Sequence, residues 1–381
     1  MRAICILLIL KITTAAIAGE PLTVLGPTTA STQVPRAGGV RHVVVHRPEA
    51  GGWTYNHHVD LGAWKGRLYI AWDSCEKDED VGISRELYST SSDSVSWSPA
   101  ELLFPQGLST ALRMYFFVAP NQRMLAIAGL RTSVNTLSEA KKAGLIVREI
   151  RADHSLGEVF TLRLPGEKID SKLPPQFMSS SDGGFVEACR QVLANKPYLE
   201  QQDYGRLLDE RRMKWHDISN WPASEPSREH FARFGKGMCF YHRADGALVG
   251  LMKWGWVILS RDEGETWTPP VRPKTLVAGM AKIWGQRTTN GKYVLLYNPD
   301  LQKRFPLVMV QSDDGITFGN MQIVNDEVSP IRFPGLYKVP GPQYVRGISE
   351  WSSDGSWKDD AIWVAYSMGK EDIMVSRVPV P

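Results

Sequence analysis

A turn motif that recurs along the chain constrains its fold more than any other feature. The stretch "SRDEGETW" (Ser260–Trp267) follows the pattern Ser-x-Asp-x-Gly-x-Thr-Trp, and "QSDDGITF" (Gln311–Phe318) repeats it with Gln for Ser and Phe for Trp. "TSSDSVSW" (Thr90–Trp97) is a degraded third copy. In such a turn the aspartate accepts backbone N–H bonds and the glycine supplies a positive φ. Because each copy follows an apolar stretch and ends in an aromatic residue, the motif predicts repeated β-hairpins.

Strand-like segments recur around these turns with a period of about 50 residues, which is typical of a β-propeller. Five units are visible, with the first strands "HHVDLGAW", "RMYFFVA", "MCFYHRA", "KIWGQRT" and "QYVRGIS". We assign the less regular residues 166–234 to one further blade with a partly helical insertion. A spare strand at Arg41–Pro48 completes the last blade, which removes exposed sheet edges. The sequence therefore predicts an all-β fold, a propeller of six four-stranded antiparallel blades, or seven if the irregular region holds two.

The N-terminal stretch "MRAICILLILKITTAAIAGE" has a basic start, an apolar run and a small-residue end, as a secretory signal does. We expect residues 1–18 to be cleaved and residues 19–381 to form a single domain that is secreted or periplasmic. No later apolar stretch is long enough to span a membrane. The formal charge of +3 falls to +1 without the signal, which holds two basic residues and no acid. The remaining chain therefore lacks the excess of positive charge that would indicate nucleic acid as a partner.

Three cysteines remain after cleavage, namely Cys75, Cys189 and Cys239, so they cannot all pair within one chain. Their spacing fits no zinc site. The acidic run Cys75–Asp80 fits no EF-hand calcium loop, and a solvated loop is the favoured interpretation. We therefore predict no metal and no cofactor, and we expect a monomer.

The repeated turn resembles the Asp-box of sialidases and other propellers with bacterial neuraminidase repeats. The resemblance implies an arginine triad for a substrate carboxylate and a tyrosine nucleophile late in the chain, for which Tyr344 is available. The early stretch "VPRAGGV" (Val34–Val40) departs from the Arg-Ile-Pro motif of sialidases, and no catalytic aspartate is identified. An exo-sialidase is therefore kept as an alternative.

The first unit, "YNHHVDLGAWKGRLYIAWDS", resembles a second group of propeller enzymes, the ulvan lyases and the enzymes that act on rhamnose–glucuronate glycans. This resemblance implies that a histidine on an inner strand, with arginines and a tyrosine from other blades, handles a uronic acid. The partner would be an anionic oligo- or polysaccharide.

Polar residues stand where the innermost strands of the units begin. Side chains at these positions converge at one mouth of the central channel, and buried charge is costly without a partner, so the set indicates an anionic ligand. The predicted site residues are His57, His58, Arg113, Tyr115, Glu187, Arg190, Lys282, Gln286, Tyr344 and Arg346.

Neighbouring side chains on a strand point to opposite faces. We therefore expect His58 in the channel as the catalytic base and His57 on the other side, in a substrate-binding role. Tyr115 or Tyr344 would be the acid, and arginines would hold the carboxylate. Glu187, Lys282 and Gln286 would complete the binding site.

The predicted function is an exported carbohydrate-active enzyme that cleaves a glycosidic linkage next to a uronate, by β-elimination or hydrolysis. A propeller that binds glycan or protein without catalysis is the remaining alternative.

Overall fold

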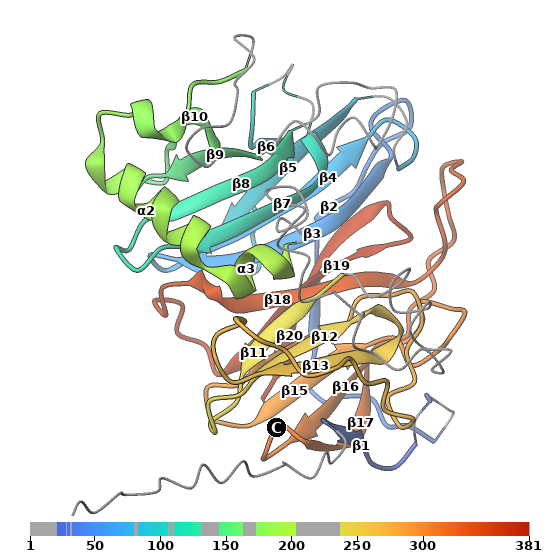
Figure 1. Cartoon of the computed structure of the whole chain (residues 1–381). Helices are drawn as coiled ribbons and strands as arrows, with labels where there is room; N and C mark the ends of the chain where they lie inside the picture. The colour runs from blue at the N-terminus through green and yellow to red at the C-terminus, as the bar shows by residue number, and fades with distance from the viewer. Residues whose placement is uncertain are drawn as a thin grey trace, which may run out of the picture.

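The computed structural model describes residues 21–27, 29–30, 33–79, 83–105, 108, 110–130, 145–162, 173–202 and 237–380. The predicted signal peptide lies outside these ranges and stays a prediction. The described residues are mostly β-strand, and Figure 1 shows their sheets packed one against another with β18 (Pro342–Ser353) crossing the middle of the molecule. None of the helices in this part of the chain is long and apolar enough to cross a membrane.

Five antiparallel meanders correspond to the five units predicted from the sequence, and the first and last of them join into one eight-stranded sheet, so the described residues form four sheets. The strands of the first two are β3 (Tyr55–Trp64), β4 (Arg67–Cys75), β5 (Ser84–Ser91) and β6 (Glu101–Leu102), then β7 (Thr110–Val118), β8 (Met124–Leu130), β9 (Leu145–Ile150) and β10 (Leu156–Leu162). The third holds β11 (Cys239–His242), β12 (Leu248–Met252) and β13 (Trp256–Ser260). The last two hold β14 (Trp284–Arg287), β15 (Tyr293–Tyr297), β16 (Leu307–Ser312) and β17 (Thr317–Asn325), then β18, β19 (Ala361–Met368) and β20 (Asp372–Pro379).

The N-terminal strand completes the last sheet, as predicted. Strand β2 (Arg41–His46) pairs antiparallel with β20, and β18 pairs parallel with β3, so the last sheet joins the first. A short strand, β1 (Thr23–Val24), adds to the edge of β17 in parallel. These pairings protect sheet edges that would otherwise be open to other chains.

The repeated turns have the hydrogen bonds expected of them, with a one-residue difference in two copies. In the first copy Asp262 accepts the backbone N–H of Thr266 at 2.8 Å, and Gly264 has a φ of 82°. In the second copy Asp314 accepts two backbone N–H groups at 2.7 Å. Asp93 has this role in the third. The motif pattern had put Asp313 and Ser92 in the aspartate position, so the second and third turns are one residue shorter than the sequence predicted.

The irregular region contains helices, which corrects the placement of two predicted site residues. After the short 3-10 helix η1 (Phe177–Ser179) come α2 (Gly183–Ala194) and α3 (Lys196–Gln201). Glu187 and Arg190 lie on the exposed face of α2, three residues apart, so the prediction that they open an inner strand is wrong. The run "GGFVEACRQVLA" has apolar residues at helical spacing, and its N-cap Asp182 accepts two backbone N–H groups, which explains the helix.

Helix α2 packs its apolar side against the sheet of β7–β10 through Phe185, Cys189 and Val192. Figure 1 shows α2 and α3 running along that sheet toward β18. Residues 203–236 lie outside the described part of the chain, so the count of six blades is still a prediction.

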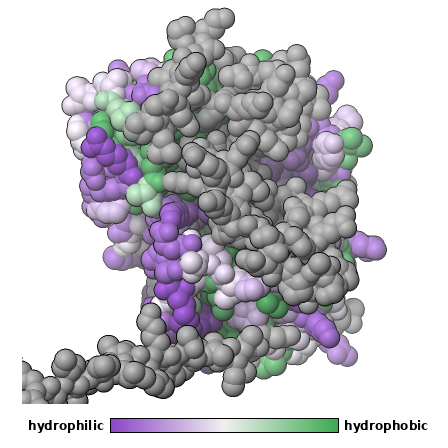
Figure 2. Space-filling view, viewed as in Figure 1, coloured by the Kyte–Doolittle hydropathy of each residue, from purple (hydrophilic) through white to green (hydrophobic). Residues whose placement is uncertain are grey.

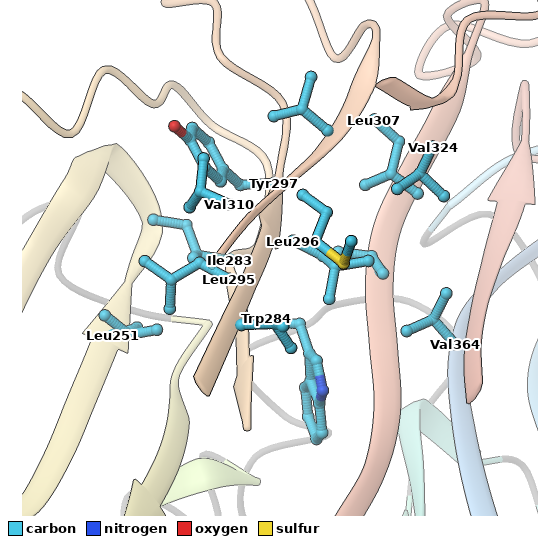
Figure 3. Close-up of a cluster of buried hydrophobic side chains, with 14 of the residues drawn as sticks. Leu251, Ile283, Trp284, Leu295, Leu296, Tyr297, Leu307, Val310, Val324 and Val364 are labelled. Carbon is cyan, nitrogen blue, oxygen red and sulfur yellow. The ribbon is translucent and has the colours of Figure 1, made fainter. Parts of the chain in front are cut away.

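Strands in the interior are apolar on both faces because each sheet is covered on both sides. In the cluster of Figure 3, Leu251 of β12, Leu295 of β15 and Val364 of β19 are fully buried. Burying one such side chain contributes about 1.5–3 kcal/mol. Cys75, Cys189 and Cys239 are all buried. The face seen in Figure 2 is mainly hydrophilic where it is coloured, with small hydrophobic groups between.

Candidate functional site

Tyr344, the third residue of β18, is the centre of a buried polar cluster at the end where the inner strands begin. Its backbone has a φ of 57°, a strained conformation for a non-glycine residue, and the pairing of β18 with β19 shifts register between Gln343 and Arg346. Only 7% of Tyr344 is exposed. Strain of this kind at a buried polar residue is common at functional sites.

Three cations from three different loops surround the Tyr344 ring. Their terminal groups lie 4.3 Å (Lys253), 5.2 Å (Lys282) and 4.7 Å (Arg304) from the ring centroid. The Lys253 ammonium also donates a hydrogen bond to the Tyr344 hydroxyl. Burial alone would raise the pKa of Tyr344, but the charges of Lys253 and Arg304 outweigh it and lower the pKa to about 8. The phenol therefore loses its proton unusually easily.

Both histidines of the "NHH" stretch lie against this tyrosine, which corrects the prediction that they face opposite sides. The ring centroids of His57 and His58 are 4.4 Å and 5.3 Å from that of Tyr344, and 4.6 Å from each other. The reason is a bulge in β3 between His57 and Asp60, where His58 has a φ of 51°. A bulge interrupts the alternation of side chains along a strand.

The two imidazoles have different partners. His57 is fully buried, its Nδ1 lies 2.6 Å from the Ser367 hydroxyl, and burial together with the charge of His58 holds its pKa well below the usual value. His57 is therefore neutral near neutral pH. His58 Nε2 lies 3.4 Å from a carboxylate oxygen of Glu79.

Glu79 is a site residue that sequence reasoning missed, because the run Cys75–Asp80 was interpreted as a solvated loop. Its carboxylate accepts hydrogen bonds from the Tyr55 hydroxyl at 2.8 Å and from Lys370 at 3.2 Å. Burial would raise the pKa of Glu79, but the hydrogen bond and charge of His58 and the charge of Lys370 outweigh it and hold the pKa well below its usual range. Glu79 is therefore an ionised anchor for His58 and Lys370.

Arg346, Tyr115 and Asp60 form a further group in the channel. The Arg346 guanidinium lies 4.8 Å from the centroid of the Tyr115 ring and is almost fully buried. Burial raises the pKa of the Asp60 carboxyl to about 7, against the opposing charge of Arg346 and the Phe116 N–H that donates to it. Asp60 is thus partly protonated near neutral pH, and its protonated form can serve as a proton donor.

Of the other predicted site residues, Lys282 is in the cluster and Gln286 is not. Gln286 lines a separate cavity at the other end of β14. Arg113 lies within β7, but its side chain is outside the described part of the structure. Lys253 and Arg304 were missed because they lie between strands. The sequence analysis compared only the residues at which the first strand of each unit begins.

The separate cavity has a volume of about 580 Å³ and includes His242, Gln286 and Glu350. His242 Nδ1 lies 2.8 Å from Glu350, and its Nε2 lies 3.1 Å from Glu263. The hydrogen bond to Glu350 is the main reason that the pKa of His242 rises to about 9. The cluster around Tyr344, with its convergent cations and strained backbone, is nonetheless the stronger candidate for chemistry, since His242 at this cavity is already held between two carboxylates.

Replacement of His242 with glutamine is expected to lower stability in a pH-dependent way. A folded pKa of about 9 against the ordinary 6.5 means that the stabilisation is complete below pH 6.5 and is lost as the pH rises through about 9. The difference in Tm between wild type and His242→Gln should therefore shrink across this range. Thermal denaturation at several pH values checks this, and a difference independent of pH would show that the ion pairs contribute nothing.

Comparison with known proteins identifies a propeller domain in this chain and solved structures that are similar to it. The family model described as "BT_1020-like, N-terminal beta propeller" matches residues 23–211. A solved structure titled "Sialidase" has 30% identity and a TM-score of 0.79, and the match covers 95% of this chain and 35% of that one. The chain therefore spans about a third of the length of that protein. No curated protein sequence matches.

A sialidase from Trypanosoma rangeli, in complex with 2,3-difluorosialic acid, matches with 12% identity and a TM-score of 0.49, over 91% of this chain and 59% of that one. The family model and the match at 30% identity show a mostly β protein with a propeller domain, similar in structure to a sialidase.

Proposed function

We propose that this propeller hydrolyses the glycosidic bond of an acidic sugar, with Tyr344 as the nucleophile and the surrounding cations as the site of the sugar carboxylate. The observation that carries the proposal is the buried Tyr344 ring with Lys253, Lys282 and Arg304 around it. The likeness to a solved sialidase at 30% identity supports it.

The chemistry explains why a tyrosine suits such a substrate. A carboxylate nucleophile would repel a sugar that carries its own carboxylate near the reacting carbon, whereas a tyrosine is neutral at rest and ionises with a cation beside it. Lys253 stabilises the phenolate by its charge and its hydrogen bond to the hydroxyl. Lys282 and Arg304, whose charged groups lie over the same ring, supply positive charge that attracts the substrate carboxylate.

The reaction needs a proton for the leaving oxygen and a water for the second step. Asp60, with a pKa raised to about 7 by burial, is a buried carboxyl of β3 that is partly protonated near neutral pH, and we assign it the role of proton donor. In the proposed sequence Tyr344 first loses its proton to solvent beside Lys253. The phenolate oxygen then bonds to the anomeric carbon as the leaving oxygen departs with the proton of Asp60. Water next attacks the anomeric carbon, gives a proton to the Asp60 carboxylate and releases the Tyr344 phenolate.

A panel of umbelliferyl glycosides tests the proposal directly. We expect fluorescence to be released from a glycoside of an acidic sugar, either sialic acid or a uronate, and not from the matched neutral glucoside or galactoside. Equal release from the neutral glycosides would show that the cations do not select the substrate. The absence of any release would exclude the proposed hydrolysis and leave either binding without catalysis or elimination, which expels a group from C4 and not from the anomeric carbon.

Elimination next to a uronate is a second candidate, and the two imidazoles stacked beside Tyr344 favour it. In that mechanism a histidine takes the C5 proton and a neutral tyrosine protonates the leaving oxygen. The product would be an unsaturated uronate with its own ultraviolet band. The proposed hydrolysis gives a saturated sugar.

Lys253→Met should shift the pH profile in a direction that separates these mechanisms. Without Lys253 the pKa of Tyr344 rises from about 8 toward its ordinary value of 10.0. If the phenolate is the nucleophile, the acidic limb of kcat/KM moves to higher pH by about one unit. If neutral tyrosine is the acid, the alkaline limb moves instead. Lys196→Met, at an exposed lysine on α3, is the control and should leave the profile unchanged.

A further inference from the structure

The second cavity lies at the opposite end of the channel from Tyr344. Strand β14 starts beside Lys282, which is in the Tyr344 cluster, and reaches the cavity at Gln286. Strand β18 likewise runs from Tyr344 to Ser349 and Glu350, which line the cavity. Its volume of about 580 Å³ is within the range of about 300–1,000 Å³ found for small-molecule sites. The propeller therefore has a second mouth that the proposed hydrolysis does not use.

Four charged residues of this mouth, His242, Arg243, Glu350 and Asp359, are held in ion pairs. Arg243 forms a bidentate ion pair with Asp245: its Nε donates to one carboxylate oxygen at 3.0 Å, and its Nη2 contacts the other. Asp359 accepts two hydrogen bonds from Arg377, at 2.7 Å and 2.6 Å, and His242 is held between two glutamates. A strongly charged ligand would have to compete with these pairs, so the cavity favours a neutral one.

Gln286 is fixed in a way that presents a hydrogen-bond donor. The Trp284 indole N–H donates to Gln286 Oε1 at 2.7 Å. Because an indole N–H can only donate, this bond fixes which end of the Gln286 amide is the oxygen, and the Nε2 group at the other end is the donor. None of the described residues accepts from this Nε2. A Cβ on Gly347 would lie 2.3 Å from Trp284 Nε1 and 2.6 Å from Gln286 Oε1, so the backbone of β18 packs directly on this pair. Gln286 is thus held rigid at the cavity wall.

Trp357 supplies an aromatic surface to the same cavity. It is half-buried, and its ring meets Trp363 edge-on with centroids 5.9 Å apart. Trp363 is itself fixed by the hydrogen bond from its N–H to Asp359 at 3.1 Å. The Trp357 N–H is buried and has no acceptor in the described part of the structure. Aromatic faces flanked by amide and carboxylate groups match a sugar ring, which has apolar C–H faces and a polar edge.

We propose that this second mouth binds a neutral sugar ring, stacked on Trp357 and hydrogen-bonded by the Gln286 amide and the Glu350 carboxylate. Such a site would hold a neutral part of a glycan at the end of the propeller opposite the Tyr344 cluster. It does not depend on hydrolysis at Tyr344.

Binding of neutral methyl glycosides tests the site. The probes are the methyl glycosides of D-galactose, D-xylose, L-arabinose and L-rhamnose, titrated at millimolar concentrations and followed by saturation-transfer NMR and tryptophan fluorescence. At least one should bind saturably, and Gln286→Ala should weaken it about fivefold through loss of one hydrogen bond. Trp357→Ala should weaken it by a similar factor, about fivefold, through loss of the stacking surface. Tyr344→Phe is the matched control and should bind the same sugar as wild type does.

Each other outcome counts against the site. Failure of all four glycosides to bind, or binding that survives both Gln286→Ala and Trp357→Ala, overturns the proposal. Binding that is lost in Tyr344→Phe places the sugar in the other mouth and also overturns it. Since Trp357→Ala removes packing against Trp363, far-ultraviolet circular dichroism must first show that the variant is folded, and Gln286→Ala alone decides the matter if it is not.

Discussion

Tyr344→Phe is expected to lower kcat for an acidic glycoside by about a thousandfold or more, because the variant keeps the ring but lacks the oxygen that would attack the sugar. The ring stacks on His57 and lies under three cations, and these contacts survive the change. Substrate binding should therefore change little. Steady-state kinetics of both proteins on the same glycoside give the comparison.

Tyr297→Phe is the matched control for this result. Tyr297 is fully buried in β15, and its hydroxyl has no hydrogen-bond partner in the described part of the chain. Loss of that hydroxyl should leave kcat unchanged. If Tyr344→Phe retains activity as Tyr297→Phe does, Tyr344 is not the nucleophile.

Glu371→Ala should cost about 3 kcal/mol of unfolding free energy, because it leaves a buried lysine without its counter-charge. The Lys338 side chain has no exposed surface, its ammonium lies 3.3 Å from Glu371, and Glu371 is itself only 3% exposed. Glu371 also accepts the backbone N–H of Phe333 at 2.9 Å, so the change releases the loop that leads into β18. Urea denaturation of both proteins measures the difference.

Glu265→Ala provides the comparison for an exposed pair. Glu265 forms an ion pair with Lys196, and both side chains are largely in solvent, so its loss should cost less than about 1 kcal/mol. An equally small effect of Glu371→Ala would mean that Lys338 finds another partner or loses its proton in the folded state.

The blades could be predicted from the sequence because turn chemistry and strand period are local properties. All five units appear as antiparallel meanders, and the spare strand "RHVVVH" adds to the last of them. The helices of residues 183–201 were only partly foreseen, since a short amphipathic segment and a buried strand share the same apolar content.

The site was predicted in part, and its errors have physical causes. Tyr344, His57, His58 and Lys282 come together, although strict alternation would have separated the histidines. The bulge that brings the two histidines together depends on a positive φ at His58. This backbone conformation cannot be predicted from the residue type. Lys253, Arg304 and Glu79 reach Tyr344 and His58 from loops, and the paths of loops are set by tertiary packing.

Product analysis in water enriched in heavy oxygen is the most direct test of hydrolysis through Tyr344. An acidic glycoside cleaved by the protein should give a saturated acidic sugar that carries one heavy oxygen at its anomeric carbon, as mass spectrometry would show, and Tyr344→Phe should form none. A released sugar with an unsaturated ring and no heavy oxygen would contradict the account and establish elimination in its place.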